Sequence, residues 1–337
     1  MLRGKRRLWI WSRLVIGLAI LGVLVWRLGT RPFLEAVQRI DVWSLVLAFA
    51  LAVPTTLCCS WRWKIVSRGL GSDLPLRTAV AAYYRSQFLN LVLPGGVLGD
   101  VHRAVRRGRD VGDVRHGLRV VAWERTAGQV VQVVLTVLLL LVLPSPVRSS
   151  MPMIAALALL AVVCAVQLGR RVFRRGTSTL VRALQALGED LRYVLLARRV
   201  WPGVALTSTV ALAGHTATFL VAAHTAGATT SVTRMLPLAL LVLLAMSVPT
   251  NIAGWGPREG AAAWVFALAG LGAAQGIATT VVYGAMALVG TLPGAVVLLA
   301  ATLRRRQGEV QPEPDELEVE PVGSAGRLGG EVTAVRR

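Results

Sequence analysis

The longest charge-free stretch covers the 44 residues 260–303 and contains no Asp, Glu, Lys or Arg. A second such stretch covers the 34 residues 200–233. A water-soluble domain carries about a quarter of its residues as charged side chains and interleaves them with apolar ones. Because only 16% of the 337 residues are charged and 55% are hydrophobic, the sequence excludes a soluble globule. It predicts an integral membrane protein.

The transmembrane segments are predicted by cutting the chain at its charges, with about 20 apolar residues for each crossing. This gives an all-α, polytopic integral membrane protein with about eight transmembrane helices and, as a further expectation, two pseudo-symmetric halves. Gly272, Gln275 and Gly276 divide the longest stretch into two segments. The predicted segments are 14–26, 42–61, 126–147, 149–169, 200–233, 235–257, 259–273 and 275–303.

Basic residues outnumber acidic ones by 37 to 17 and gather in clusters. In a polytopic membrane protein such clusters mark cytoplasmic loops beside anionic lipid headgroups, and we prefer this interpretation to nucleic-acid binding. All clusters face the cytoplasm only if residues 78–99 enter the membrane and return as a re-entrant hairpin. Both termini are then cytoplasmic, in a bacterial-type inner (plasma) membrane. The clusters are residues 3–7, 62–77, 103–115, 170–199 and 304–306.

The C-terminal residues have a different composition from the rest of the chain. Residues 307–337 hold seven acidic side chains among Pro, Gly and Val, without helical or strand periodicity. Such a segment has too few apolar side chains to bury. We therefore predict a transmembrane domain over 1–306 and a disordered acidic cytoplasmic tail over 307–337.

Two motifs break the apolar pattern in the same way, one in each half of the chain. Residues 90–103 read NLVLPGGVLGDVHR and residues 249–260 read PTNIAGWGPREG, so each break is followed by an acid and an arginine. Non-helical backbone at membrane depth is tolerated only where it lines an enclosed or watered cavity. Paired interrupted segments mark the substrate site of a transporter. The helix-break residues are Pro94, Gly95, Gly96, Gly99, Pro249, Gly254, Gly256 and Pro257.

A helix that restarts after such a break points backbone N–H groups toward an anion, and a nearby guanidinium can hold a phosphate with two hydrogen bonds. We therefore expect Arg103 and Arg258 to hold a lipid phosphate. The alternative is that both motifs are ordinary turns at the membrane surface. The candidate substrate-binding residues are Asn90, Asp100, Arg103, Glu124, Arg125, Asn251, Arg258 and Glu259.

Glu124 and Arg125 stand where the segment 126–147 begins. Charges inside a membrane are costly and usually pair or serve transport. Glu124 is therefore expected to meet an arginine across the site, although an interfacial Glu–Arg pair without further function stays open. The candidate partners are Arg103, Arg119 and Arg258.

Several classes of enzyme lack their motifs in this sequence. It contains no P-loop, HExxH, GxSxG or CxxC pattern. Cys58, Cys59 and Cys164 lie in apolar runs without disulfide or metal-ligand spacing. His215 and His224 have no acid nearby, which favours core histidines over a proton relay. We expect no metal, no cofactor and no catalytic residue.

The motifs resemble the membrane domain of lysylphosphatidylglycerol synthases/flippases and their stand-alone relatives over residues 8–303. They are RWK at 62–64, the run 88–103, WERTAG at 123–128 and SVPTNIAGWGPREG at 247–260. The resemblance implies an eight-span domain with re-entrant elements that moves an anionic phospholipid from the inner to the outer leaflet. The site residues that it implies are Asp100, Arg103, Glu124, Arg125, Arg258 and Glu259.

The family's full-length members also carry a soluble aminoacyl-transferase domain, for which the 34 residues after Leu303 are too few. The expected function is therefore translocation of an anionic phospholipid or related lipid phosphate, not its synthesis. Two alternatives stay open: a membrane-embedded transferase acting on a polyprenyl-phosphate or glycolipid, with Asp100 or Glu124 as general base, and a non-catalytic envelope scaffold. The expected partners are anionic membrane lipids and a separate envelope or lipid-modifying enzyme. The lipid, the direction, the driving force and the oligomeric state stay open.

Overall fold

The computed structural model describes residues 31–93, 96–143, 200–247 and 257–309, and the regular elements in these ranges are all helices. The predicted segments 14–26 and 149–169 lie outside the described residues. So do Asn251 with most of the second break, and the tail from residue 310 onward.

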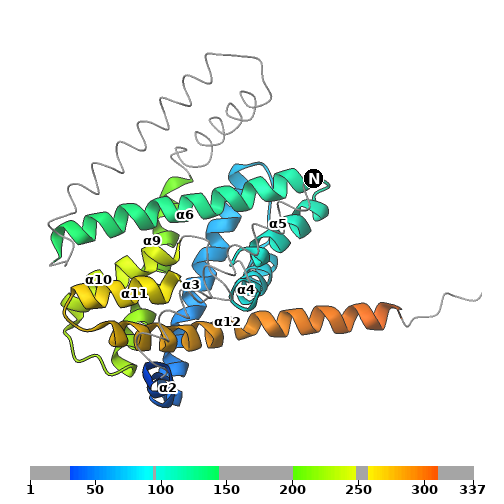
Figure 1. Cartoon of the computed structure of the whole chain (residues 1–337). Coiled ribbons are helices and arrows are strands. Elements are labelled where there is room, and N and C mark those ends of the chain that lie inside the picture. Colours follow the sequence, from blue (N-terminus) through cyan, green and yellow to red (C-terminus); the bar gives the residue numbers. More distant parts are fainter. Residues whose placement is uncertain (1–30, 94–95, 144–199, 248–256, 310–337) are drawn as a thin grey trace, which may run out of the picture. The chain divides into compact units, whose positions relative to one another are not determined.

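Within each described range, short connections join successive helices (Figure 1). Four of them, α3, α6, α9 and α12, are long and apolar enough to cross a membrane. This confirms the predicted all-α, polytopic membrane fold. In chain order the described helices are α2 (Arg31–Gln38), α3 (Val42–Gly69), α4 (Leu76–Val92), α5 (Leu98–Asp110), α6 (Val114–Val142), α9 (Trp201–Thr225), α10 (Val232–Met246), α11 (Pro257–Leu268) and α12 (Ala273–Glu309).

Acidic N-caps define where two of the long helices begin. The Asp41 carboxylate accepts a hydrogen bond from the Ser44 N–H at 3.3 Å at the start of α3. The hydrogen bond with the Ser44 side chain lowers the pKa of Asp41. Asp113 caps α6 in the same way, accepting from the N–H of Arg115 at 2.8 Å. Helix α6 therefore begins twelve residues before the predicted segment 126–147.

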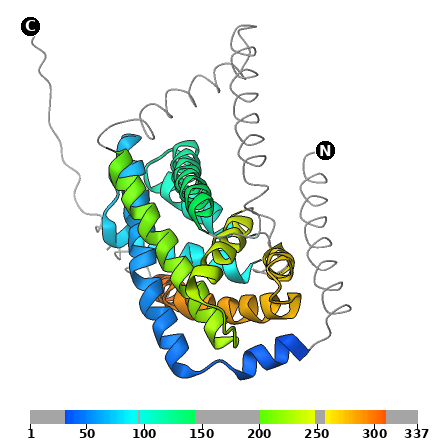
Figure 2. The same ribbon diagram turned by 90° about the vertical axis from the view of Figure 1, so that its left-hand side faces the viewer.

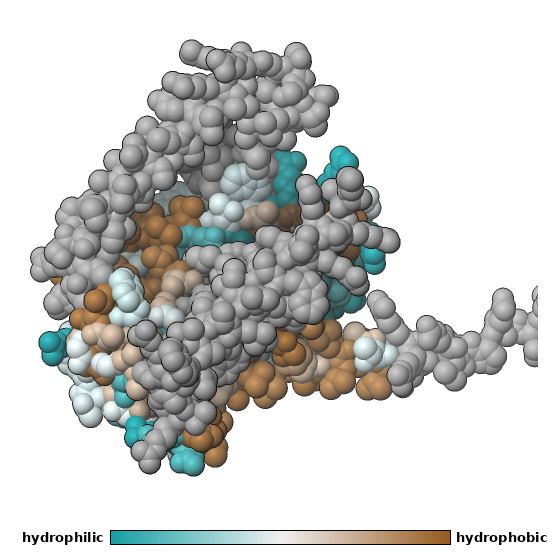
Figure 3. Space-filling view, viewed as in Figure 1, coloured by the Kyte–Doolittle hydropathy of each residue, from teal (hydrophilic) through white to brown (hydrophobic). Residues whose placement is uncertain are grey.

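The long helices turn apolar side chains outward and polar ones inward. Helix α6 exposes Val130, Val134 and Leu138 but buries Glu124 completely. Helix α12 exposes Leu288 and other apolar residues, and Figure 3 shows its surface in the apolar colour. Lipid tails accept such a surface, whereas the buried charges need partners inside the protein.

Helices α4 and α5 form a hairpin. Helix α4 ends at Val92 and α5 begins at Leu98, so the predicted Pro-Gly-Gly motif lies between them in the sequence, with Pro94 and Gly95 outside the described residues. Gly96 has a φ of 63°, which favours glycine. A Cβ atom on Gly99 would lie 2.0 Å from the Ser86 carbonyl oxygen, so only glycine lets the two helices approach this closely.

The last residues of the α4–α5 hairpin lie beside the residues that precede it. The Arg107 guanidinium, near the end of α5, donates to the carbonyl oxygen of Asp73, which precedes α4. The His116 ring, at the start of α6, lies 3.0 Å from the Ser72 hydroxyl. Because residues before α4 contact residues after α5, the predicted re-entrant segment forms a helical hairpin.

Helices α10 and α11 form a second hairpin, where the sequence predicts two complete crossings. They have 15 and 12 residues, fewer than the about 20 needed for a bilayer core. The carbonyl oxygen of Ala226, just before α10, accepts from Gln275 at 3.1 Å, just after α11. It also accepts from Arg39 at 2.8 Å, before α3. This hairpin therefore starts and ends beside the N-terminal end of α3.

The two hairpins start from opposite ends of the long helices. Helices α3 and α9 lie side by side and run antiparallel (Figure 2), with Ile65 near Gly203 and Thr55 near Gly214. The α4–α5 hairpin follows the C-terminal end of α3, and the α10–α11 hairpin follows the C-terminal end of α9. In Figure 1 they lie to the right and to the left of α3. The two hairpins are therefore inverted relative to each other along the long helices, and the two pseudo-symmetric halves stay a prediction.

Exposed arginines gather at one end of the long helices. We call it the basic end: it is formed by the C-terminal end of α3, the N-terminal ends of α6 and α9, and the open ends of α4 and α5. The opposite end carries fewer arginines among the described residues, Arg39 and Arg234 being examples. The exposed arginines of the basic end are Arg68, Arg77, Arg106, Arg109, Arg115 and Arg119.

Candidate functional site: a buried cluster of charges

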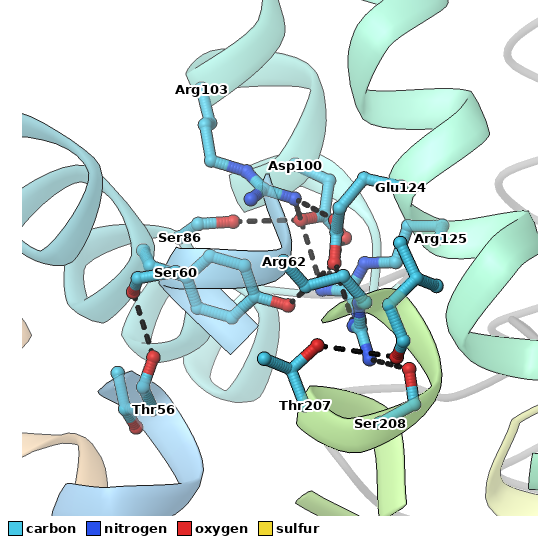
Figure 4. A network of polar contacts seen from close by, with 12 residues as sticks. Thr56, Ser60, Arg62, Ser86, Asp100, Arg103, Glu124, Arg125, Thr207 and Ser208 are labelled. Carbon is cyan, nitrogen blue, oxygen red and sulfur yellow. Dashed lines mark hydrogen bonds and ion pairs between the residues drawn. The ribbon is translucent and has the colours of Figure 1, made fainter. Parts of the chain in front are cut away.

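Five charged side chains from three helices meet inside the protein, and we call them the five-charge cluster (Figure 4). Three are arginines and two are acids, so the cluster has a formal net charge of +1. Side chains from α4 and α9 complete it. Its members are Arg62 on α3, Asp100 and Arg103 on α5, and Glu124 and Arg125 on α6.

Glu124 stands at the centre of the cluster and is fully buried. Its Oε1 accepts from Arg62 at 2.6 and 2.9 Å, and its Oε2 accepts from Arg103 at 3.0 Å. The Tyr83 hydroxyl donates to the same Oε1 at 3.3 Å. Glu124 thus joins α3, α4 and α5 to α6, and each of its oxygens faces an arginine.

Asp100 joins the tip of the first hairpin to α6. Its carboxylate accepts from Arg103 at 2.9 Å and from Arg125 at 2.7 Å. Ser86 and Asn90 on α4 donate to the same carboxylate at 2.9 and 3.0 Å. Burial raises the pKa of Asp100, but the positive charges of Arg125 and Arg103 lower it more, so this pKa lies well below its ordinary value.

Arg103 is held between two aromatic rings. Its guanidinium carbon lies 4.5 Å from the centre of the Trp63 ring and 4.4 Å from that of Tyr83. Only Nη2 reaches the two acids, and within the described part of the chain the buried Nε and Nη1 have no hydrogen-bond partner. Cation–π contacts stabilise the charge without using these N–H groups. Arg103 therefore keeps donors for a further acceptor.

Arg125 is the member of the cluster that reaches the surface. Its side chain is 41% exposed, whereas those of Arg62 and Arg103 are 7% and 0% exposed. Arg125 is also bonded to Asp100 alone among the acids, while the other two arginines share Glu124. Arg125 is therefore the arginine of the cluster whose side chain is partly open to the surroundings, although its Nε is buried.

Arg62 is the principal member that the sequence did not single out. The sequence places it in a cytoplasmic cluster, but the structure buries it within α3, where it also donates to the Ser208 hydroxyl at 3.1 Å. A Cβ atom on Gly128 would lie 2.7 Å from its guanidinium carbon. Gly128 therefore provides the space in which Arg62 reaches Glu124.

The cluster lies at some depth from the basic end. Arg62 precedes the end of α3 by seven residues, and Glu124 and Ser208 follow the starts of α6 and α9 by ten and seven. At about 1.5 Å per residue, these positions lie about 10–15 Å from the helix ends. Charges at this depth below an apolar surface belong to a protein-enclosed site and not to a surface loop.

Arg258 and Glu259 form a second charged group, at the start of α11. Both are buried, and Arg258 donates to the Glu259 carboxylate from Nε at 2.8 Å and from Nη2 at 2.7 Å. The Arg258 guanidinium lies 6.0 Å from the Tyr283 ring on α12. A Cβ atom on Gly284 would come within 2.9 Å of it. A glycine on the long helix after each hairpin thus makes room for an arginine.

The structure brings together five of the predicted site residues: Asn90, Asp100, Arg103, Glu124 and Arg125. Of the arginines predicted as partners of Glu124, Arg103 binds it. The sequence did not predict Arg62 as a partner of Glu124. It also did not predict the supporting groups Tyr83, Ser86 and Ser208. Arg62 and Arg103 are buried, although the basic clusters predicted both at the cytoplasmic surface. The RWK motif at 62–64 was the one available signal for Arg62, since its charge resembles that of its exposed neighbours.

The described residues contain no group of three or more His, Cys, Asp or Glu side chains that could hold a metal ion. Cys58 and Cys59 are free thiols. The chemistry of the charged site is therefore that of arginines and carboxylates, which suits recognition of an anion.

Comparison with known proteins places this geometry in a family. Residues 10–294 match the family model of the lysylphosphatidylglycerol synthase TM region. The chain belongs to this family. The match includes both hairpins and every member of the five-charge cluster, so the resemblance expected from the sequence is confirmed. No curated protein and no solved structure matches the chain.

Membership of the lysylphosphatidylglycerol synthase TM region family indicates a membrane protein of lipid modification or lipid transport. Within that family assignment, the cluster gives this chain a specific chemical property. Its three arginines exceed its two acids by one charge, and the side chain of one of these arginines, Arg125, is partly exposed.

Proposed function

We propose that this protein binds an anionic phospholipid or related lipid phosphate and moves it between the two leaflets. One observation carries the proposal: three arginines meet two acids in a cluster with a formal net charge of +1, and one of these arginines, Arg125, has a partly exposed side chain. A lipid phosphate neutralises the excess charge and accepts hydrogen bonds from Arg125 and from the free N–H groups of Arg103. The inverted arrangement of the two hairpins suits alternating exposure of such a site.

The second charged group supplies a further phosphate position on the other hairpin. Arg258 on α11 is the counterpart of Arg103 on α5, and each is paired with an acid on its own helix. We propose that the lipid phosphate meets Arg125 and Arg103 from one leaflet and Arg258 from the other. A separate envelope or lipid-modifying enzyme would supply or consume the lipid.

The orientation follows from the charges. We propose that the basic end faces the cytoplasm and that both termini lie on that side, because arginines near membrane spans favour the anionic cytoplasmic leaflet. In a cysteine-free variant, a cysteine at Gly112 should label with an impermeant maleimide only from inside. A cysteine at Thr230 should label only from outside. Labelling of both from the same side contradicts the arrangement.

The direct test is leaflet exchange of a fluorescent phosphatidylglycerol in proteoliposomes, normalised to the amount of reconstituted protein. Arg125→Gln should slow exchange about tenfold or more, since a charge-assisted hydrogen bond contributes about 1.5–3 kcal/mol. Arg106→Gln is the matched control, because Arg106 is exposed on α5 at the basic end. Equal rates for the wild type and the Arg125 variant would contradict the proposed function.

The geometry gives less support to a transferase. A general base needs a pKa near the working pH, whereas the paired arginines lower the pKa of Asp100 below its ordinary value. Glu124, the other candidate base, uses both of its oxygens to bind arginines.

A further inference from the structure

A cavity of about 70 Å³ lies between α3, α4, α9 and α12, apart from the five-charge cluster. One water molecule needs about 10–15 Å³ by the same measure, so the space suits about five or six non-hydrogen atoms. Small residues on α3 and α12 make the room. The polar lining residues include Thr55, Thr56, Gln87, His215, Thr218 and Tyr283.

The cavity offers hydrogen-bonding groups that carry no charge. The hydroxyls of Thr55 and Thr218 donate to carbonyl oxygens of their own helices at 2.7 and 2.9 Å, which leaves their oxygens as acceptors. Gln87 accepts from the Thr56 hydroxyl at 3.1 Å through its carbonyl oxygen. Its NH₂ group then remains as a donor. A ligand hydroxyl can both donate and accept, so it matches this mixture.

A second pair of polar groups forms another wall. The Tyr283 hydroxyl and the His215 Nδ1 lie 3.3 Å apart, and His215 is exposed. Among the described lining residues there is no Asp, Glu, Lys or Arg. A cationic headgroup such as a lysyl ammonium would find no carboxylate here, and burying an unpaired charge is costly.

The cavity has charged groups on two sides. Thr56 precedes Arg62 on α3 by six residues, or about 9 Å along the helix. On the other side, the Tyr283 ring lies 6.0 Å from the Arg258 guanidinium. Helix α3 therefore contributes to both the five-charge cluster and the cavity, and Tyr283 contacts both the Arg258 guanidinium and the cavity.

We infer that this cavity binds the uncharged, hydroxylated headgroup of the transported lipid, with glycerol as the group of matching size. This inference rests on the proposed function and adds the class of headgroup. The lipid is then an anionic phosphodiester with a polyol headgroup, and selection against amino headgroups comes from the lack of a carboxylate in the cavity lining.

The test compares two fluorescent lipids that differ only in the headgroup, phosphatidylglycerol and phosphatidic acid, in proteoliposomes of the full chain. The wild type should exchange phosphatidylglycerol faster. Thr218→Val and Gln87→Leu should each slow it about two- to tenfold, the effect of one hydrogen bond. Neither change should alter the rate for phosphatidic acid. A lysyl ester of phosphatidylglycerol should be exchanged more slowly than phosphatidylglycerol itself.

Thr209→Val is the matched control on the same helix. The Thr209 hydroxyl also donates to a carbonyl four residues earlier, at 2.8 Å, but its side chain is exposed and does not line the cavity. Its variant should exchange both lipids like the wild type, and a thermal unfolding curve should show that all variants are folded.

The outcomes separate this inference from the proposed function. Exchange of both lipids at the same rate by the wild type, or equal slowing of both by the cavity variants, overturns the headgroup assignment alone. Faster exchange of the lysyl ester overturns it as well. Exchange of neither lipid by the wild type contradicts the proposed function and, with it, the headgroup assignment.

Discussion

The two hairpins carry similar sequence motifs but are held by different interactions. In the α4–α5 hairpin, Asp100 and Arg103 reach Arg125 and Glu124 on α6, and Glu124 binds Arg62 on α3. In the α10–α11 hairpin, Arg258 and Glu259 pair within one helix. The similar sequence motifs therefore predict a similar course of the backbone in the two hairpins. The ion pairs of the side chains differ between them.

Apolar packing holds the second hairpin. Leu238 and Val242 on α10 and Phe266 on α11 are buried in the same apolar core. Phe219 on α9 lies 6.4 Å from Phe266 and 5.7 Å from Tyr283, between ring centres. An anion competes for the arginines that fix the first hairpin, while it leaves this core untouched. We infer that ligand binding affects the first hairpin more.

The largest expected effect is that of Glu124→Gln compared with Glu259→Gln. Loss of Glu124 leaves Arg62 and Arg103 buried without their shared acid, and breaking a buried ion pair costs about 3–5 kcal/mol. The ion pair of Glu259 with Arg258 joins two neighbouring residues of one helix, so the loss of that pair separates no helices and we expect a smaller destabilisation. Thermal unfolding of the purified variants in one detergent measures the difference. Equal destabilisation would contradict the unequal roles of the two groups.

A smaller loss of stability is expected when either of the two glycines that face arginines is replaced by alanine. In Gly128→Ala the new Cβ would lie 2.7 Å from the guanidinium carbon of Arg62, which Glu124 fixes. Overpacking of this kind costs about 1–3 kcal/mol. In Gly284→Ala the Cβ would meet the end of Arg258 at 2.9 Å. Gly128→Ala should lower both the unfolding temperature and the exchange rate, and Gly284→Ala should lower them less. The reverse order would show that Arg258 is the more rigid arginine.

The smallest expected effect is the loss at low pH of the stability that the Asp100 ion pairs contribute. Because the pKa of Asp100 is lowered in the folded protein from its ordinary value of 3.8, its ion pairs stabilise the fold fully above that value. The stabilisation is lost only as the pH falls further. The difference in unfolding temperature between the wild type and Asp100→Asn should thus stay constant from pH 7 to about pH 4.5 and narrow below pH 4. Narrowing near neutral pH would mean that Asp100 is not held by its arginines.

The sequence by itself determined the apolar helices, the position of the first break and five of the side chains in the site. These features are local: charge-free runs predict helices, Pro and Gly end them, and an acid with an arginine after a break at membrane depth needs a partner. The family followed from the same motifs. The α4–α5 hairpin was predictable because all five basic clusters can face the same side of the membrane only if this segment enters the membrane and returns.

Only the tertiary structure decided which charges meet and which face lipid. Arg62 looks in the sequence like a member of a surface cluster, yet it binds Glu124, which lies 62 residues away along the chain. The second hairpin returns to its starting end, as the hydrogen bond from Gln275 to the Ala226 carbonyl oxygen shows. A charge run or an apolar run does not encode which face of a helix packs inward, since that depends on contacts with helices distant in sequence. For the same reason, the cavity between four helices has no signature in any one of them.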